Sequence, residues 1–252
     1  MVMGQSNMAA GATIGSNHNT RGNDGEIIAG RGFWPGLSTT LKHNCKFASF
    51  VLLSKGSYQY ELNIEFPFSL VIDNEKEGVL EIMPAYYWMY NMYALERNAK
   101  KFIARDKRVD KSLKIESDYL APDTAYEMLK AIDTLKEILT NAERQDIVFK
   151  DEMPDIVYTN SEYIEKSKRK IKIVKIQKAI NAYRQMLVYY AIKVLCTYFE
   201  ANRLDFPSFL VKYATHLSKL KAPDEWVNVG GFLMPRVDFQ SLIEKIKNSS
   251  LS

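Results

Sequence analysis

The chain has 252 residues, which is enough for one large or two small domains with a buried core. Its formal net charge of +4 is too small to indicate nucleic-acid binding, so no nucleic-acid partner is expected. No cluster of Cys or His has the spacing of metal ligands, so no metal site is predicted.

The sequence predicts a cytoplasmic protein without a membrane span. Its first residues lack the basic and apolar regions of a signal peptide. The most apolar stretch, residues 186–199, is interrupted by Lys193 and is too short to cross a bilayer. The two cysteines, Cys45 and Cys196, are far apart, which favours reduced thiols.

The N-terminal region follows a six-residue rhythm. Val2, Met8 and Ile14 are six residues apart, and Ile28 and Trp34 repeat the spacing after a shift of frame. In a left-handed parallel β-helix, an aliphatic side chain points inward once per short strand at this period. The rhythm therefore predicts parallel strands stacked as coils over about the first 45 residues. A chance spacing in a Gly-rich loop is the alternative.

Strands and two helices are predicted next along the chain. Residues 46–82 alternate apolar and polar side chains, as strands do. Pro84 favours the start of an aromatic-rich helix over 85–104, in which Trp88 and Tyr93 are expected to be buried. A capping box of Thr124 and Glu127 predicts a second helix over 124–141.

A long third helix is predicted from Thr159, where Thr159 and Glu162 would form another capping box. Apolar side chains at three- and four-residue spacing between Ile173 and Val194 suggest the seam of a packed helix. The basic run 166–178 would be a solvated face of this helix, with an anionic membrane surface or nucleic acid as alternatives. Shorter helices are predicted at about 207–219 and 237–247.

Several stretches of the sequence carry a family resemblance. They are IGSNHNTRGNDGEI, GRGFWPGL, LKHN, FPFSL, PAYYWMYNMYALERN and RDKR within residues 12–108, and DEWVNVGGFL at 224–233. The chain resembles an uncharacterised bacterial family of large hexapeptide-repeat proteins, in which a trimeric LpxA-like, left-handed β-helix precedes a helical C-terminal part. Because members of that family are considerably longer, the chain looks like a fragment of one.

The resemblance implies a fold class of β-helix plus α. Residues 1–82 would be the end of a partial left-handed parallel β-helix, and residues 83–252 a mostly helical, bundle-like domain. It also implies a homo-oligomer, specifically a trimer. By fold analogy alone, the function would be transferase-like, with acyl or nucleotidyl transfer on a sugar or sugar nucleotide. Acyl coenzyme A and a nucleotide sugar are the candidate cofactors. The alternative is a non-catalytic module that binds a ligand or serves as an assembly scaffold.

The predicted site lies in residues 14–45, which hold two of the three histidines and six of the twelve glycines. His18 and His43 are the candidate catalytic bases, because the ordinary pKa of histidine lies near neutral pH. Asn19 and Asn44 would orient an imidazole or bind substrate. The alternative is that these are polar surface residues that make local hydrogen bonds.

Two arginines and two acids complete the predicted site. Arg21 and Arg31 are candidates for binding a phosphate or carboxylate of an anionic ligand. Asp24 and Glu26 would hold one imidazole tautomer or bind ligand. The alternative is that the arginines pair with these acids between neighbouring coils.

Overall fold

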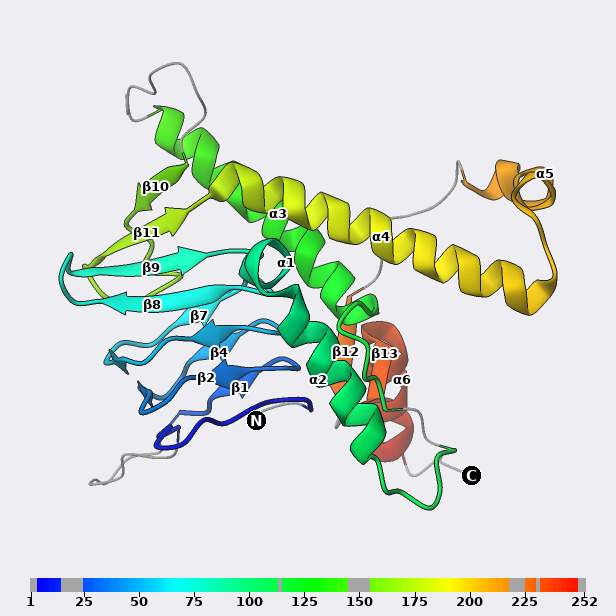
Figure 1. Cartoon of the computed structure of the whole chain (residues 1–252), viewed down its shortest axis with the longest axis horizontal. Helices are drawn as coiled ribbons and strands as arrows, with labels where there is room; N and C mark the ends of the chain where they lie inside the picture. Colours follow the sequence, from blue (N-terminus) through cyan, green and yellow to red (C-terminus); the bar gives the residue numbers. More distant parts are fainter. Residues whose placement is uncertain are drawn as a thin grey trace.

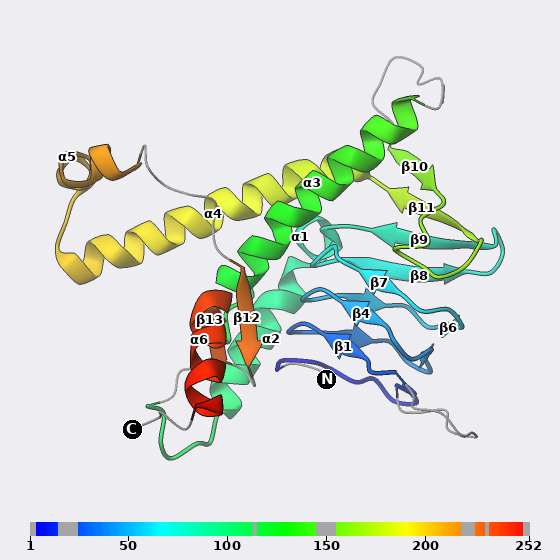
Figure 2. The ribbon, with the colours of Figure 1, turned by 180° about the vertical axis from the view of Figure 1, so that it is seen from behind.

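A computed structural model of the chain describes residues 4–14, 25–112, 115–144, 155–217, 225–229 and 232–248. Short strands stack on one side of the molecule, and helices run along the other side (Figures 1 and 2). The strands are β1 (Ile28–Ala29), β2 (Trp34–Pro35), β3 (Thr40–Leu41), β4 (Lys46–Phe47), β5 (Leu52–Leu53), β6 (Ser57–Tyr58), β7 (Asn63–Ile64), β8 (Leu70–Asn74), β9 (Val79–Met83), β10 (Ile156–Thr159), β11 (Lys170–Val174), β12 (Trp226–Val229) and β13 (Phe232–Pro235). The helices are α1 (Tyr86–Tyr90), α2 (Met92–Arg105), α3 (Pro122–Arg144), α4 (Ile176–Asn202), α5 (Phe206–Leu217) and α6 (Arg236–Lys247).

The two-residue strands pair in parallel with strands 17 or 18 residues further along the chain. Ile28 pairs with Lys46, which pairs with Asn63, and similar pairs join β2 to β5, β5 to β8 and β3 to β6. Buried aromatic rings stack inside these layers, with Phe33 and Phe47 4.7 Å apart and Phe50 and Phe68 5.0 Å apart. Inward-facing apolar side chains at a regular spacing therefore hold this region together.

The largest sheet combines parallel and antiparallel strands. Its order is β10-β11-β9-β8-β5-β2. β8 and β9 form an antiparallel hairpin, β11 pairs in parallel with β9, and β10 pairs antiparallel with β11. Residues 156–174 thus extend a sheet that begins near residue 34.

The predicted fold class, a partial left-handed parallel β-helix followed by a bundle-like helical domain, is wrong. The described strands are divided among four sheets, the largest sheet is mixed, and six helices accompany them. The inward positions predicted from the six-residue rhythm are also wrong where the structure describes them, because Met8 and Ile28 are 42% and 41% exposed, and the buried side chains at that spacing, Ile27 and Phe33, lie one residue earlier. The rhythm also does not specify strand direction or the sheet to which a strand belongs. The helices also do not form one bundle, because α3 contacts both α4 and β10 while the outer half of α4 projects away from the strands (Figure 1).

The helix predictions were confirmed in part. The predicted helix 85–104 is present as α1 and α2, with a break at Asn91, and α3, α5 and α6 lie close to their predicted positions. Trp88 is half-buried, whereas Tyr93 is 73% exposed, so the expected burial of Tyr93 is wrong. Glu127 does not cap α3, because it bonds instead to Ser49.

The predicted long helix from Thr159 is wrong at its N-terminal end. Residues 156–159 and 170–174 are strands, and the helix begins only at Ile176. The alternation of lysine and isoleucine in 170–173 fits a strand, with Ile171 and Ile173 buried. The basic run is therefore not a helix face, and Lys172 pairs with Glu77 and Glu81 across the sheet surface.

Tyr183 joins α4 to the strand region. Its buried hydroxyl donates to the carbonyl of Pro67 at 2.6 Å and accepts the N–H of Ala85 at 3.2 Å. Ala85 has a left-handed backbone with φ of 54°, at the turn where β9 leads into α1. A single side chain thus satisfies two buried backbone groups that come from different parts of the chain.

We predict that Tyr183→Phe lowers the free energy of unfolding by about 1–3 kcal/mol, because Pro67 and Ala85 lose their buried partner. Urea denaturation would measure the change. Tyr189→Phe is the matched control, since Tyr189 lies on the same helix and is 48% exposed. Equal stabilities of the two variants would contradict the prediction.

Candidate functional site

Of the predicted site residues that the structure describes, Arg31 lies apart from His43 and Asn44. Four of them, His18, Asn19, Arg21 and Asp24, lie outside the described residues. Of the others, Glu26 is exposed just before β1, Arg31 lies in the turn after β1, and His43 and Asn44 lie in the turn between β3 and β4. Arg31 and His43 therefore occupy different turns of the strand region.

Asn44 makes contacts that stabilise the fold. Its backbone is left-handed, with φ of 64°, and its amide donates to the Glu61 carboxylate at 3.1 Å. Lys166 also pairs with Glu61, and together with Asn44 it lowers the pKa of that carboxyl. The backbone of Gly25 lies against the Asn44 side chain and leaves no room there for a β-carbon. Asn44 thus fastens neighbouring turns of the chain to one another.

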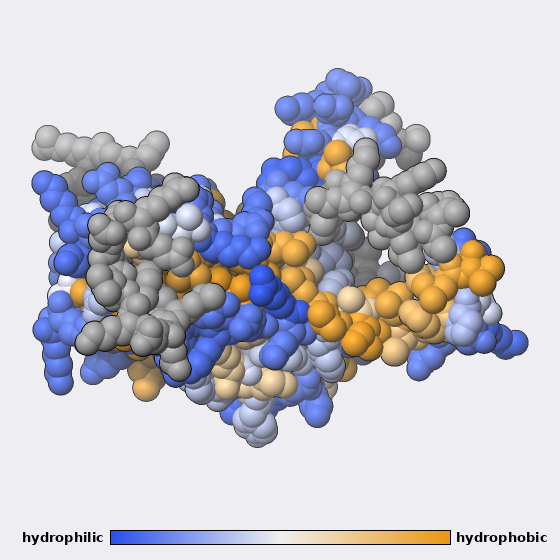
Figure 3. Space-filling view, turned by 90° about the horizontal axis from the view of Figure 1, so that it is seen from above, coloured by the Kyte–Doolittle hydropathy of each residue, from blue (hydrophilic) through white to orange (hydrophobic). Residues whose placement is uncertain are grey.

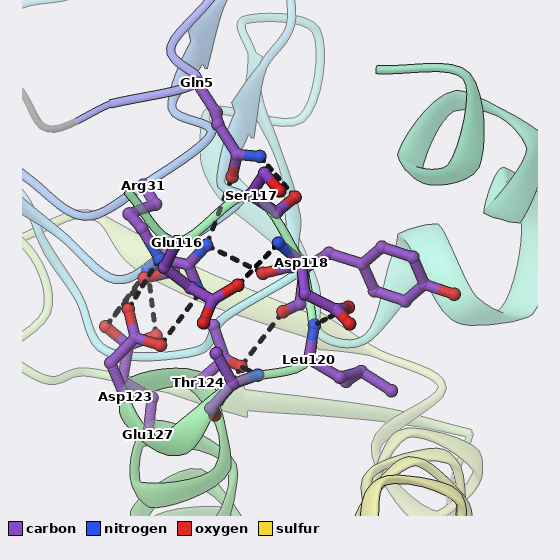
Figure 4. Close-up of polar contacts among 12 residues, drawn as sticks. Gln5, Arg31, Glu116, Ser117, Asp118, Leu120, Asp123, Thr124 and Glu127 are labelled. Carbon is purple, nitrogen blue, oxygen red and sulfur yellow. Dashed lines mark hydrogen bonds and ion pairs between the residues drawn. The ribbon is translucent and has the colours of Figure 1, made fainter. Parts of the chain in front are cut away.

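Arg31 forms a buried ion pair (Figure 4). The residue is only 1% exposed, and its Nε and Nη2 donate to the two carboxylate oxygens of Asp123 at 2.7 and 2.8 Å. Its Nη1 donates to the Asp118 carbonyl at 2.7 Å and to Gln5 at 3.1 Å. A bidentate pair with further acceptors is the arrangement that offsets the cost of burying a charge. Arg31 is therefore a structural anchor, and its predicted role in ligand binding is wrong.

Local sequence explains why Arg31 turns inward. Gly32 follows with φ of 69°, and a β-carbon there would meet the ring of Phe50 at 2.3 Å. The same ring lies 5.6 Å from the guanidinium carbon of Arg31. A glycine at this position lets the turn pack closely, so that the arginine reaches the first turn of α3.

Glu127 lies one turn further along α3. Its carboxylate accepts hydrogen bonds from the backbone N–H of Ser49 at 3.0 Å and from the Ser49 hydroxyl at 3.2 Å. Burial and the nearby charge of Asp123 raise the pKa of Glu127 to about 8, although the bonds from Ser49 oppose that shift. The carboxyl is therefore an internal group that tends to hold a proton near neutral pH.

A pocket of about 460 Å³ lies between the N-terminal segment, α2 and the loop after α2. We call it the basic pocket. It is lined by Gln5, Ser6, Asn7, Arg97, Asn98, Lys101, Phe102, Arg105, Asp106, Lys107, Arg108 and Ile115. Five of these side chains are cationic and one is acidic, so the pocket carries an excess of positive charge.

Most of that charge is not neutralised by residues that the structure describes. Arg108 forms an ion pair with Asp106 at 2.9 Å and lowers the pKa of that carboxyl to about 2. Arg97, Lys101, Arg105 and Lys107 have no ion pair within the described parts of the chain. The Nε of Arg97 is buried and has no hydrogen-bond partner among the described residues. A buried donor without an acceptor is unusual, and an anion in the pocket would supply one.

One wall of the basic pocket depends on the Arg31 anchor. Gln5 lines the pocket, accepts from Arg31 and donates to the carbonyl of Ser117 (Figure 4). Side chains of the segment around Ser117 alternate between two sides. Ile115, Ser117 and Tyr119 line the basic pocket or the small recess beside it, whereas Glu116, Asp118 and Leu120 line a separate groove of about 710 Å³ against α4. The segment is thus a thin partition that Arg31 and Gln5 hold in place.

Part of this pocket is foreshadowed by patterns in the sequence. ALERN and RDKR both belong to the stretches that carry the family resemblance, and they supply Arg97, Asn98 and residues 105–108. Gln5 and Lys101 were missed, because a lone glutamine near the N-terminus and one lysine of a helical pair have no distinctive pattern. Only the chain path places Gln5 beside α2.

The described residues contain neither a cluster of metal ligands nor a helix that could span a membrane. No group of three or more His, Cys, Asp or Glu that could hold a metal ion occurs among them. Within the same parts of the chain, no helix is sufficiently long and apolar to cross a membrane.

Comparisons with known proteins found one relevant similarity. A protein of Treponema pallidum (strain Nichols), described only as an uncharacterized protein, is 48% identical over 263 aligned residues that cover 98% of this chain. The chain spans about a third of that relative's length, since the alignment covers 35% of it. No family model and no solved structure matches the chain. The resemblance to hexapeptide-repeat proteins and the trimeric assembly therefore stay predictions.

We predict that Asp123→Ala lowers the free energy of unfolding by about 3–5 kcal/mol, because it leaves the Arg31 charge buried and unpaired. Chemical denaturation would measure this loss. Asp133→Ala is the control on the same helix, where the side chain is 82% exposed and the change should stay within about 0.5 kcal/mol. Similar losses in both variants would show that the ion pair is not an anchor.

A second prediction concerns pH and Glu127. Because the folded-state pKa of about 8 exceeds the ordinary value of 4.5, the native protein holds a proton that the unfolded chain loses between those values. The free energy of unfolding should therefore fall as pH rises from about 5 to 8, by at most roughly 1 kcal/mol per pH unit, since Glu127 is partly exposed.

Denaturation at pH 5, 6.5 and 8 would test this linkage. Glu127→Gln should remove the decline, because its amide cannot ionise. Glu137→Gln, an exposed change on the same helix, should retain the decline. Parallel pH profiles for the parent and Glu127→Gln would refute the assignment.

Proposed function

We propose that this chain is a binding module for a phosphorylated small molecule, held in the basic pocket. The single observation that carries the proposal is the set of four unpaired cations around one cavity, together with the buried and unpartnered Nε of Arg97. Guanidinium and ammonium groups match the charge and acceptor geometry of phosphate oxygens. The volume of about 460 Å³ lies within the range of small-molecule sites.

The alternative explanation, that the cations of the basic pocket are only the solvated C-terminal end of α2, is weaker. Cations near a helix C-terminus are favoured by the helix dipole, and Arg105 ends α2. Arg97, however, lies two turns before that end, and its Nε is buried. The dipole reaches only the last turn, so it gives no reason for a desolvated, unpartnered guanidinium at residue 97.

The neutral residues of the pocket favour a ligand that also carries hydroxyl groups. The side chains of Gln5, Asn7 and Asn98 supply amide donors and acceptors, and Phe102 supplies an apolar surface. Such groups bind sugars, while the cations bind phosphate. A sugar phosphate or a nucleotide sugar therefore suits the pocket, in agreement with the ligand class expected from the sequence.

Binding without catalysis is favoured over acyl or nucleotidyl transfer. Transfer needs a general base close to the reacting group. The described residues that line the basic pocket include no histidine, and their one carboxylate, Asp106, is a weak base because Arg108 lowers its pKa to about 2. His43 lies in the turn between β3 and β4, in the strand region rather than at α2.

We predict that inorganic pyrophosphate and UDP-glucose raise the melting temperature of the chain, whereas glucose does not, since binding to the native state stabilises it by mass action. Arg97→Gln and Lys101→Ala should weaken binding at least tenfold in isothermal titration calorimetry. Each removes a cation that forms no ion pair with a described acid.

Lys100→Ala is the matched control, because Lys100 is an exposed neighbour on α2 that does not line the pocket. It should bind as the parent does, and added salt should weaken binding by the parent. The proposal fails if neither probe binds, or if Arg97→Gln binds as tightly as Lys100→Ala.

A further inference from the structure

Tyr93 is an exposed aromatic side chain on α2, one turn before Arg97 of the basic pocket. It is 73% exposed, more than any other aromatic side chain among the described residues. The apolar side chains exposed on α4 and α5 gather along those two helices (Figure 3), whereas the residues that follow Tyr93 at helical spacing are cations. The Tyr93 ring therefore adds little to the core and is available to a ligand.

Tyr93, Arg97, Lys101 and Arg105 form a row that winds slowly along α2. Each is four residues from the next, so consecutive side chains are neighbours on the helix surface. Four residues advance a helix by about 6 Å, so the row extends over about 18 Å. The three cations line the basic pocket, and Tyr93 comes directly before them. An aromatic ring is thus followed by three positive charges in succession.

Arg97 connects the Tyr93 ring to the basic pocket. Its guanidinium carbon lies 5.6 Å from the centroid of the ring, within the range of a cation–π interaction. This contact covers one face of the ring and restricts its orientation. Because most of the side chain is exposed, the opposite face is open to solvent. The ring is therefore a flat, oriented surface beside a guanidinium whose buried Nε has no acceptor among the described residues.

We propose, on the basis of the binding function above, that the phosphorylated ligand is a nucleotide whose base stacks on Tyr93 while its phosphates bind Arg97 and Lys101. Proteins that bind single-stranded nucleic acid combine stacking on aromatic side chains with cations along the phosphates. The ribose would span the step of about 6 Å between Tyr93 and Arg97. A sugar phosphate has no flat group for the ring, so Tyr93 favours a nucleotide over a sugar phosphate.

Two alternatives for the aromatic contact are weaker. Phe102 also lies at the pocket, but it is half-buried and offers less of its ring to a base. Single exposed apolar side chains are common on protein surfaces and need no function. Tyr93 differs from those, because a cation of the pocket stacks on its ring and further cations continue the row.

Isothermal titration calorimetry with UDP, ADP and inorganic pyrophosphate tests the base site. UDP and ADP should both bind, because stacking is tolerant of the base. Tyr93→Leu should weaken the binding of both nucleotides at least about fivefold through the loss of stacking, and it should leave the affinity for pyrophosphate unchanged. Tyr93→Phe retains the ring and should bind all three probes as the parent does.

Tyr90→Leu is the matched control. Tyr90 is also exposed and also has a cation over its ring, with the Lys175 ammonium 5.4 Å from the centroid, but it lies outside the row of cations. This variant should bind every probe as the parent does.

The nucleotide assignment is overturned if Tyr93→Leu weakens pyrophosphate as much as UDP, or if it weakens neither. It is also overturned if Phe102→Leu, rather than Tyr93→Leu, selectively weakens UDP. An affinity that keeps rising with the length of an oligonucleotide would identify a nucleic-acid strand in place of a nucleotide. If none of the three probes binds the parent, the phosphate-binding function fails, and the nucleotide site fails with it.

Discussion

The buried ion pair between Arg31 and Asp123 is the interaction on which the rest of the arrangement depends. It fastens the turn after β1 to the first turn of α3, residues separated by 92 positions in sequence. The same guanidinium also holds Gln5 and the carbonyl of Asp118. Burying a charge is tolerated only when its donors find acceptors in good geometry, so these partners fix one another's positions. The pocket wall that contains Gln5 is held in position by these hydrogen bonds.

Two arginines of the chain differ in how far the fold satisfies their hydrogen-bond donors. Arg31 is fully buried and its Nε, Nη1 and Nη2 all donate to protein acceptors. Arg97 lines an open cavity, stacks 5.6 Å from the ring of Tyr93 and has a buried Nε without an acceptor. The first arginine has its interactions completed by the fold, whereas the second has donor capacity that a ligand would complete.

The basic pocket and the exposed apolar side chains of α4 are chemically distinct and belong to separate helices. The C-terminal half of α2 contributes charge to the pocket, whereas the projecting half of α4 presents apolar side chains such as Val188 and Ile192. Residues 115–120 lie between them. Arg31 binds the backbone of this segment on one side, and on the other side the segment and α4 form the two walls of a groove.

Local patterns in the sequence determined the division into a Gly-rich region of short strands and a charged helical region, because glycine content and charge change sharply between the two. The six-residue rhythm placed the inward positions one residue too late, since Ile27 and Phe33 are buried and Ile28 is 41% exposed. Local patterns also located α3, α5 and α6. They failed at residues 170–174, where Ile171 and Ile173 fit a helical stripe and a strand equally well, and only pairing with β9 decides between the two. The roles of Arg31 and Arg97 were likewise decided by the tertiary structure. Whether an arginine meets an acid or a cavity depends on residues far away in sequence, and no local pattern encodes that path.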